Sequence, residues 1–103
     1  MHISSIEQKL KPLLTELNIG SLEEIVKDYL FTEILYRISK FEEEIQYFQK
    51  KYQKTFEEFK KEYENSEENF EAYDDLMAWE FAIEGYNYWK QKFEGLKHVL
   101  QNN

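Results

Sequence analysis

The stretch that decides the fold is FTEILYRISKFEEEIQYFQKKY, residues Phe31 to Tyr52. Its apolar residues recur at alternating steps of three and four, which only a long helix can present on one side. A second stretch, Trp79 to Leu100, repeats this rhythm. The sequence therefore predicts two long helices that pack seam against seam in a coiled-coil-like hairpin. The seams are Phe31, Ile34, Ile38, Phe41, Ile45, Phe48 and Tyr52, and Trp79, Ala82, Tyr86, Trp89, Phe93, Leu96 and Leu100.

The relative direction of the two helices is left open by the connector length, and the charges beside the seams favour the antiparallel arrangement. If facing residue numbers sum to about 134, Glu42 lies opposite Lys90 and Glu44 opposite Lys92, as the flanks of a coiled coil require. The layers predicted by this register are Ile34 with Leu100, Ile38 with Leu96, Phe41 with Phe93, Ile45 with Trp89, Phe48 with Tyr86 and Tyr52 with Ala82.

The chain of 103 residues, with three glycines and one proline, has the length and composition of a single all-α domain. Helix signals predict helices over about 4–18, 21–54, 56–65 and 75–101, the first packed on the long hairpin and the third in its connector. Pro12 predicts a kink or a broken turn in the first helix. Gly20 fits the left-handed position after it.

Capping patterns mark two further starts. Ser21 with Glu24, and Thr55 with Glu58, have the spacing of capping boxes. Asp74 or Asp75 is predicted to cap the last helix, after an irregular passage over residues 70–73.

Composition limits the possible functions. A net charge of -8 disfavours nucleic-acid binding, which needs clustered lysines and arginines. No cysteine is present for a disulfide or thiolate metal site, and the two histidines lack metal-site spacing. No apolar run or leader-like N-terminus indicates a membrane or secreted protein. We expect a cytoplasmic protein that is not an enzyme and uses no cofactor.

The connector between the seams is the candidate functional region. Residues 53–75 hold nine carboxylates and three lysines, so -6 of the net charge lies there. Aromatic residues interleave these acids, and aromatic anchors within a charged surface favour a protein partner of opposite charge. The candidate partner-binding residues are Phe56, Glu57, Glu58, Phe59, Tyr63, Phe70, Tyr73, Asp74 and Asp75.

Four further aromatic residues, Tyr36, Tyr47, Phe81 and Tyr88, lie off the two seams. Either the first and third helices cover them, or they form a second apolar face for a partner.

The connector also resembles a known group of sequences. KYQKTFEEF followed by DLMAWE is similar to a pattern in small prokaryotic proteins, KYG-x-(S/T)-F-E-E-F and then D-x-x-E/A-W-E, that look like antitoxin-like halves of two-gene toxin–antitoxin modules. The matching residues are Lys51, Tyr52, Thr55, Phe56, Glu57, Glu58, Phe59, Asp75, Trp79 and Glu80. Gln53 stands where the pattern has glycine, which puts a tight turn there in doubt.

The resemblance implies an antitoxin-like protein. Together with the acidic connector, it predicts a non-enzymatic module that neutralises a basic, toxin-like protein by occlusion. The alternative is a self-assembling structural homodimer, formed by the broad apolar face of residues 22–35.

Overall fold

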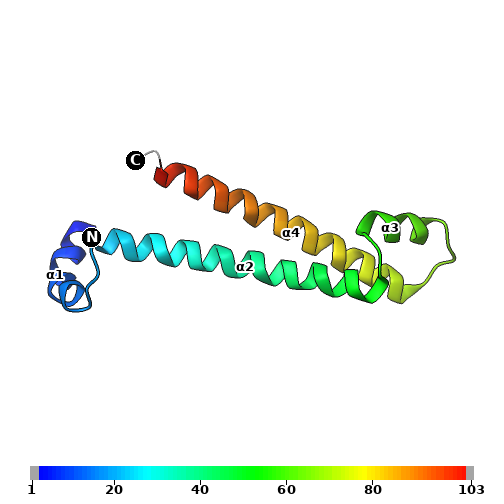
Figure 1. Ribbon diagram of the computed structural model, residues 1–103, viewed down its shortest axis with the longest axis horizontal. Coiled ribbons are helices and arrows are strands. Elements are labelled where there is room, and N and C mark those ends of the chain that lie inside the picture. The colour runs from blue at the N-terminus through cyan, green and yellow to red at the C-terminus, as the bar shows by residue number, and fades with distance from the viewer. Residues whose placement is uncertain (1–2, 102–103) are drawn as a thin grey trace. The chain divides into compact units, whose positions relative to one another are not determined.

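The computed structural model describes the backbone of residues 3–101 and the side chains of residues 5–101. It contains four α-helices, α1 (Ile3–Glu16), α2 (Leu22–Tyr52), α3 (Phe56–Glu64) and α4 (Phe70–Gln101) (Figure 1). The long helices α2 and α4 pack antiparallel, with α3 in their connector, so the prediction of an all-α helical hairpin is confirmed. The chain divides into two compact units, one within residues 1–33 and the other within residues 34–103.

The predicted helix starts at residues 21 and 55 are present. The Glu24 N–H donates to Ser21 Oγ at 3.1 Å, which caps α2. At α3 the capping box is complete, because Glu58 N–H donates to Thr55 Oγ1 and Thr55 N–H donates back to the Glu58 carboxylate. Each bond satisfies a backbone or cap group that the first turn leaves unpaired.

The end of α1 differs from the prediction. α1 is continuous through Pro12 and ends at Glu16, and the left-handed residue after it is Asn18, with φ 62°, not Gly20. The Ile19 N–H donates to the Leu14 carbonyl at 2.7 Å, and the Asn18 N–H donates to that of Thr15 at 3.1 Å. These two bonds form a Schellman motif, in which asparagine can replace glycine.

α2 also ends at a residue in the left-handed conformation, but this residue is glutamine, which adopts that conformation less readily than asparagine does. Gln53 has φ 55°, and its N–H donates to the Gln49 carbonyl at 2.8 Å. This is the αL motif that usually carries glycine. The tight turn was in doubt because Gln53 stands where the pattern has glycine. The turn is formed, with Gln53 in a strained backbone conformation.

α4 begins five residues earlier than predicted. The Asn69 side chain accepts a hydrogen bond from the Ala72 N–H at 3.1 Å, so Asn69 is the N-cap and residues 70–73 are helical. The prediction of an irregular passage there, with Asp74 or Asp75 as the cap, was wrong because asparagine is as good a cap as aspartate.

The predicted register of α2 on α4 was also wrong, by about one heptad. Phe41 lies against Gly85, where a Cβ atom would come within 2.5 Å of the Phe41 Cζ, and not opposite Phe93. Phe48 stacks on Trp79 with ring centroids 5.6 Å apart. Facing numbers thus sum to about 127, seven less than predicted, because a heptad seam repeats every seven residues.

The charge pairs used to choose the register are not formed. Glu42 accepts a hydrogen bond from Gln46 of its own helix at 3.4 Å, and Lys92 lies over the ring of Tyr88, 5.2 Å from its centroid. Exposed ion pairs contribute only about 0–1 kcal/mol, which is too little to oppose better packing at Gly85.

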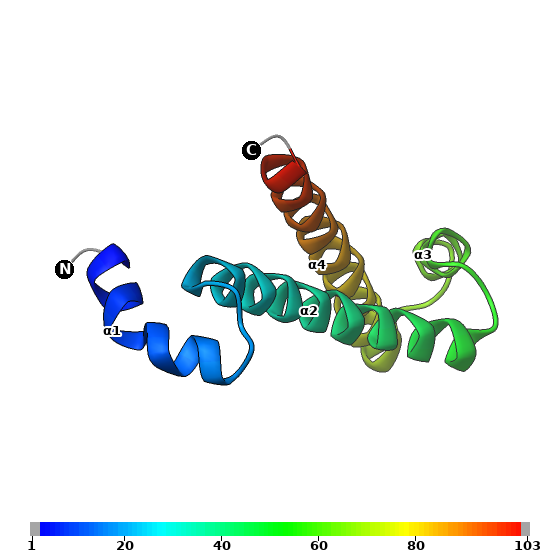
Figure 2. The same ribbon diagram turned by 60° about the vertical axis from the view of Figure 1, so that its left-hand side comes forward.

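The core lies at the end of the hairpin that the connector closes. Trp79 is fully buried, and four aromatic rings surround it at centroid distances of 5.5–6.2 Å: Phe48, Tyr52, Phe56 and Phe59. α3 lies beside this end in both views (Figures 1 and 2). Among the described residues, the buried Trp79 Nε1–H has no hydrogen-bond acceptor, which costs about 1–3 kcal/mol.

Candidate partner-binding face

The aromatic residues predicted as anchors on α3 are part of the core. Phe59 is only 6% exposed, and Phe56 and Tyr63 are half-buried against the same cluster. The Phe56 ring meets Trp79 edge-on, and the Phe59 ring lies 4.1 Å from that of Tyr52. A partner can reach little of these three side chains without opening the fold.

Two of the predicted acidic residues are engaged within the chain. Glu58 accepts the capping hydrogen bonds from Thr55, chiefly from its backbone, and these lower the pKa of its carboxyl group. Asp75 accepts hydrogen bonds from Lys51, at 2.6 Å, and from the Tyr52 hydroxyl. Glu57 and Asp74 are exposed and remain available to a partner.

The contacts of Asp75 join α2 to α4 at the closed end. Burial alone would raise the Asp75 pKa, but the hydrogen bonds from Lys51 and Tyr52 outweigh it and hold this pKa below its usual value. Burial, with the bond to Asp75, raises the pKa of Tyr52 to about 12. Lys51 also pairs with Glu71 at 3.1 Å. These groups stabilise the hairpin, because Lys51 and Asp75 favour each other's charged forms while Tyr52 stays neutral and donates a hydrogen bond to Asp75.

The remaining predicted residues lie on an exposed side of α4. Phe70 is 80% exposed and Tyr73 47%, and Asp74 lies beside them. Met77 and Phe81 continue the same side at helical spacing and are also exposed. We name this surface the acidic aromatic face, and it comprises Phe70, Tyr73, Asp74, Met77, Phe81 and Glu84.

The side of α4 behind this face is buried. The buried residues of α4, Leu76, Trp79 and Ala82, occupy the opposite side of the same turns. Two of its rings also touch other elements, since Tyr73 lies 6.4 Å from the Tyr63 ring and Phe81 5.8 Å from that of Phe41. These contacts position the Tyr73 and Phe81 rings before a partner binds, which lowers the side-chain entropy that those two residues lose on binding.

The segment that contains the acidic aromatic face is strongly negative. Residues 57–84 hold eleven carboxylates and two lysines, which leaves ten carboxylates and eleven lysines and arginines for all other positions. The negative charge of the chain therefore belongs entirely to α3, the segment after it and the first half of α4. Such a concentration steers and selects a positively charged partner.

The off-seam aromatic residues are not covered. Phe81 is 63% exposed, Tyr47 59%, Tyr36 58% and Tyr88 52%. Of these, only Phe81 belongs to the acidic aromatic face, whereas Lys40 lies over the Tyr36 ring and Lys92 over that of Tyr88. Within residues 34–103, α3 does not cover these four side chains, so that part of the covering interpretation does not describe this structure.

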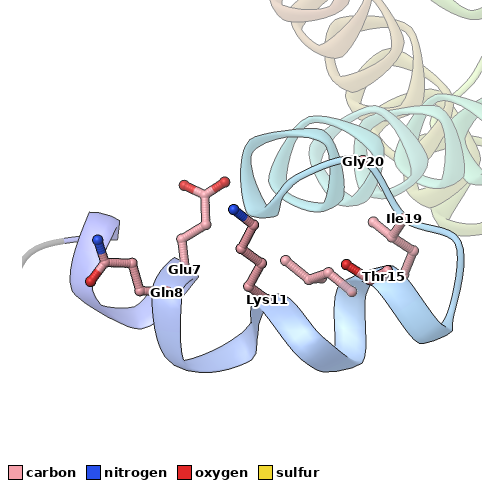
Figure 3. Close-up of a pocket in the computed structure, with 7 residues that line it drawn as sticks. Glu7, Gln8, Lys11, Thr15, Ile19 and Gly20 are labelled. Atoms are coloured by element: carbon pink, nitrogen blue, oxygen red, sulfur yellow. The ribbon is translucent and has the colours of Figure 1, made fainter.

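Two of the hollows on the surface of the described residues have polar side chains in their lining. One, of about 390 Å³, lies between the end of α2, α3 and the start of α4, and of its two carboxylates Glu62 is already paired with Lys54. The other, of about 250 Å³, lies along α1 (Figure 3), where Glu7, Gln8 and Lys11 line it. In the first hollow, the Ser66 hydroxyl donates to the Tyr63 carbonyl and not to a base that would activate it as a nucleophile. Within residues 3–101, no group of three or more His, Cys, Asp or Glu side chains could hold a metal ion.

Sequence reasoning missed Met77 and Glu84 as members of the face. The steps from Phe70 to Met77 and Phe81 are seven and four, which is a helical stripe. The signal was hidden because residues 70–73 were predicted to be irregular.

Comparisons with known proteins give no family for this chain. No protein-family model, no curated protein and no solved structure matches it. In the part of the chain that the structure describes, no helix is long and apolar enough to cross a membrane.

Proposed function

We propose that this protein is a non-enzymatic binding module whose acidic aromatic face docks a basic protein partner. The observation that carries the proposal is a row of exposed large apolar side chains on a helix whose opposite side is buried, within the most strongly charged segment of the sequence. Aromatic and methionine side chains in a charged rim are the composition of protein interfaces, in which a few such residues supply most of the affinity.

The partner that fits is a basic protein, and the action that fits is occlusion. Carboxylates such as Asp74 and Glu84 attract lysines and arginines at long range, while Phe70 and Phe81 fill apolar sites on the docked surface. The resemblance of KYQKTFEEF and DLMAWE to antitoxin-like proteins supports a partner of the toxin type. Binding then neutralises that partner by covering the basic surface it needs.

The test combines capture and rescue. The tagged protein is used to capture binding proteins from its native cells, and is co-expressed with the product of the neighbouring gene. The proposal expects a basic partner, salt-sensitive binding, and suppression of the partner's toxicity. Recovery of no partner, together with no suppression of toxicity, would count decisively against it.

Matched variants locate the interface. Phe70→Ser with Met77→Ser removes two apolar members of the face, and Tyr36→Ser alters a similarly exposed ring on α2. We expect the first variant to lose at least tenfold in affinity, because truncating two anchors removes more than about 1.4 kcal/mol. The Tyr36 variant should bind as the unaltered protein does.

A further inference from the structure

A second heptad pattern runs along the exposed side of α4. It begins at Phe70 and ends at Tyr88, and its six members follow one another at steps of four, three, four, three and four. All of them are exposed. We name them the outer seam: Phe70, Asp74, Met77, Phe81, Glu84 and Tyr88. A seam of this kind is the surface on which one helix packs against another.

The outer seam lies opposite the side of α4 that packs within the hairpin. At 3.6 residues per turn, Met77 and Phe81 each lie about 160° around the helix axis from the fully buried Trp79. The apolar members of the seam keep between 41% and 80% of their surface exposed. The packing of residues 34–103 therefore leaves this seam open along its length.

The length and spacing of the outer seam favour an α-helix as its occupant. From Phe70 to Tyr88 the helix axis rises by about 27 Å, with one layer of side chains about every 5.4 Å. A facing helix repeats with the same spacing, whereas an extended strand presents a side chain to one face only about every 6.8 Å. A strand would therefore fall out of alignment by more than one layer over this length.

Two positions of the outer seam carry carboxylates instead of apolar side chains. Asp74 and Glu84 each lie between apolar members of the seam, so a helix docked on the seam would remove both from water. Among the described side chains, no ion pair engages either carboxylate. Removing a carboxylate from water without a cation is strongly unfavourable, so the occupant must supply a cation at each position.

The same two carboxylates oppose a second copy of this seam as the occupant. In a parallel pair each carboxylate would face its own counterpart. In an antiparallel pair, the register that aligns the apolar members places Asp74 opposite Glu84. Both arrangements bring like charges together, which opposes association. The rim supplies no compensating cation either, because residues 70–88 contain five carboxylates and no lysine or arginine.

We propose that the outer seam binds an amphipathic helix of the basic partner, with one lysine or arginine opposite Asp74 and another opposite Glu84. This proposal, which rests on the proposed function, names the element that the partner contributes. The apolar residues of that helix repeat the steps of seven, four and seven of the outer seam, and each cation lies four residues inside an outermost apolar residue. This pattern reads the same from either end, so it holds for a parallel and for an antiparallel helix.

The test uses two synthetic peptides of about 22 residues that follow this pattern. One has lysine at both cation positions, and the other has glutamate there in an otherwise identical sequence. Each is titrated into the full chain and into the variant Asp74→Lys with Glu84→Lys, with fluorescence anisotropy for affinity and circular dichroism for helix formation. The lysine peptide should bind the unaltered chain and the glutamate peptide the variant, each as a helix, and the mismatched pairs should bind about tenfold more weakly or worse.

The matched control is the full chain with Glu67→Lys and Glu68→Lys. It makes the same change in net charge at two exposed residues outside the outer seam. It should bind the lysine peptide within about threefold of the unaltered chain, because it alters only long-range attraction. Equal losses for the two altered chains, binding without helix formation, or no binding of the lysine peptide by the unaltered chain overturns the proposal.

The partner recovered by capture separates this proposal from the proposed function. Recovery of no partner, with the peptides bound as expected, counts against the proposed function and not against the outer seam as a site for a basic helix. A basic partner whose segment protected from hydrogen exchange in the complex lacks the pattern overturns this proposal and leaves the proposed function in place. A protected segment that carries the pattern, with both cations, supports the two together.

Discussion

Residues 34–103 and residues 3–33 differ sharply in how they use apolar side chains. The larger unit buries Ile38, Phe48, Phe59, Leu76, Trp79 and Ala82, whereas the smaller buries only Leu14 among its described side chains. The difference teaches that helical pattern alone does not make a core. In the larger unit, α3 folds back and closes an aromatic cluster, while most large apolar side chains of the smaller unit stay exposed.

The largest expected effect comes from the centre of the aromatic cluster. Trp79→Ala should lower the free energy of unfolding of residues 34–103 by about 3–5 kcal/mol, because it removes a fully buried ring and leaves a cavity. Leu14→Ala should destabilise residues 5–33 without unfolding the rest. Urea unfolding followed by circular dichroism, with hydrogen exchange to locate the loss, measures both.

Trp79→Phe serves as the control for cavity size, and it also removes the unpaired indole N–H. Its loss should be well below that of Trp79→Ala. If Leu14→Ala unfolds the whole chain, or Trp79→Ala leaves residues 72–83 protected, the division of stability between the two units is wrong.

The next effect tests the polar contacts that close the hairpin. Asp75→Asn should cost about 1–2 kcal/mol at pH 7, because hydrogen bonds to charged groups are worth about 1.5–3 kcal/mol and part of the site is solvated. The folded pKa of Asp75 is lowered, so its contribution is complete above the unfolded value of about 3.9 and is lost as pH falls through the folded pKa.

The stability difference between Asp75→Asn and the unaltered chain should therefore shrink as pH falls from 7 toward about 2. Glu71→Gln removes the more exposed partner of Lys51 and should cost less than about 0.5 kcal/mol. Denaturant midpoints across pH provide the measurement. A difference that stays constant with pH would show that the Asp75 carboxylate is not a net stabilising charge.

A smaller effect tests what fixes the packing of α2 on α4. Gly85→Ala should lose about 1 kcal/mol despite the better helix propensity of alanine, because its Cβ would meet the Phe41 ring. Gly95→Ala is the matched control, since no atom lies within 4 Å of a Cβ there, and it should gain up to about 1 kcal/mol. Equal gains at both positions in thermal unfolding would refute the register.

The smallest expected effect comes from the two residues whose backbone is left-handed, Gln53 and Asn18. Gln53→Gly relieves a φ of 55° but gives up a side-chain bond to the Lys50 carbonyl, so it should stabilise residues 34–103 by about 0.5 kcal/mol. Asn18→Gly should change only the exchange rates of residues 5–33. A loss of stability with Gln53→Gly would mean that the side-chain bond outweighs the backbone strain.

The fold class was predictable from sequence because periodicity, caps and matching seam lengths are local or repetitive signals. The antiparallel direction was predicted correctly, but from charge pairs that the structure does not form. The register was not, because seven-residue repeats superimpose on themselves and the deciding contact joins a seam phenylalanine to Gly85, which lies off the predicted seam. The start of α4 was missed because Asn69 fits a loop as well as a cap.

The candidate site was predicted in part. Phe70, Tyr73 and Asp74 lie exposed as a binding face requires, but Phe56 and Phe59 serve the core. The sequence could not separate a core role from a binding role, since an aromatic residue on a short amphipathic helix suits either. Only the packing of α3 on Trp79 assigns Phe56 and Phe59 to the core.

The most direct test of the account is hydroxyl-radical footprinting of the protein alone and bound to the partner recovered by capture. Aromatic residues and methionine report their own exposure in this measurement. The account predicts that binding protects Phe70, Tyr73, Met77 and Phe81 and leaves Tyr36 and Tyr47 of α2 unchanged. Protection of Tyr36 and Tyr47, with Phe70 and Met77 still fully reactive, would contradict it.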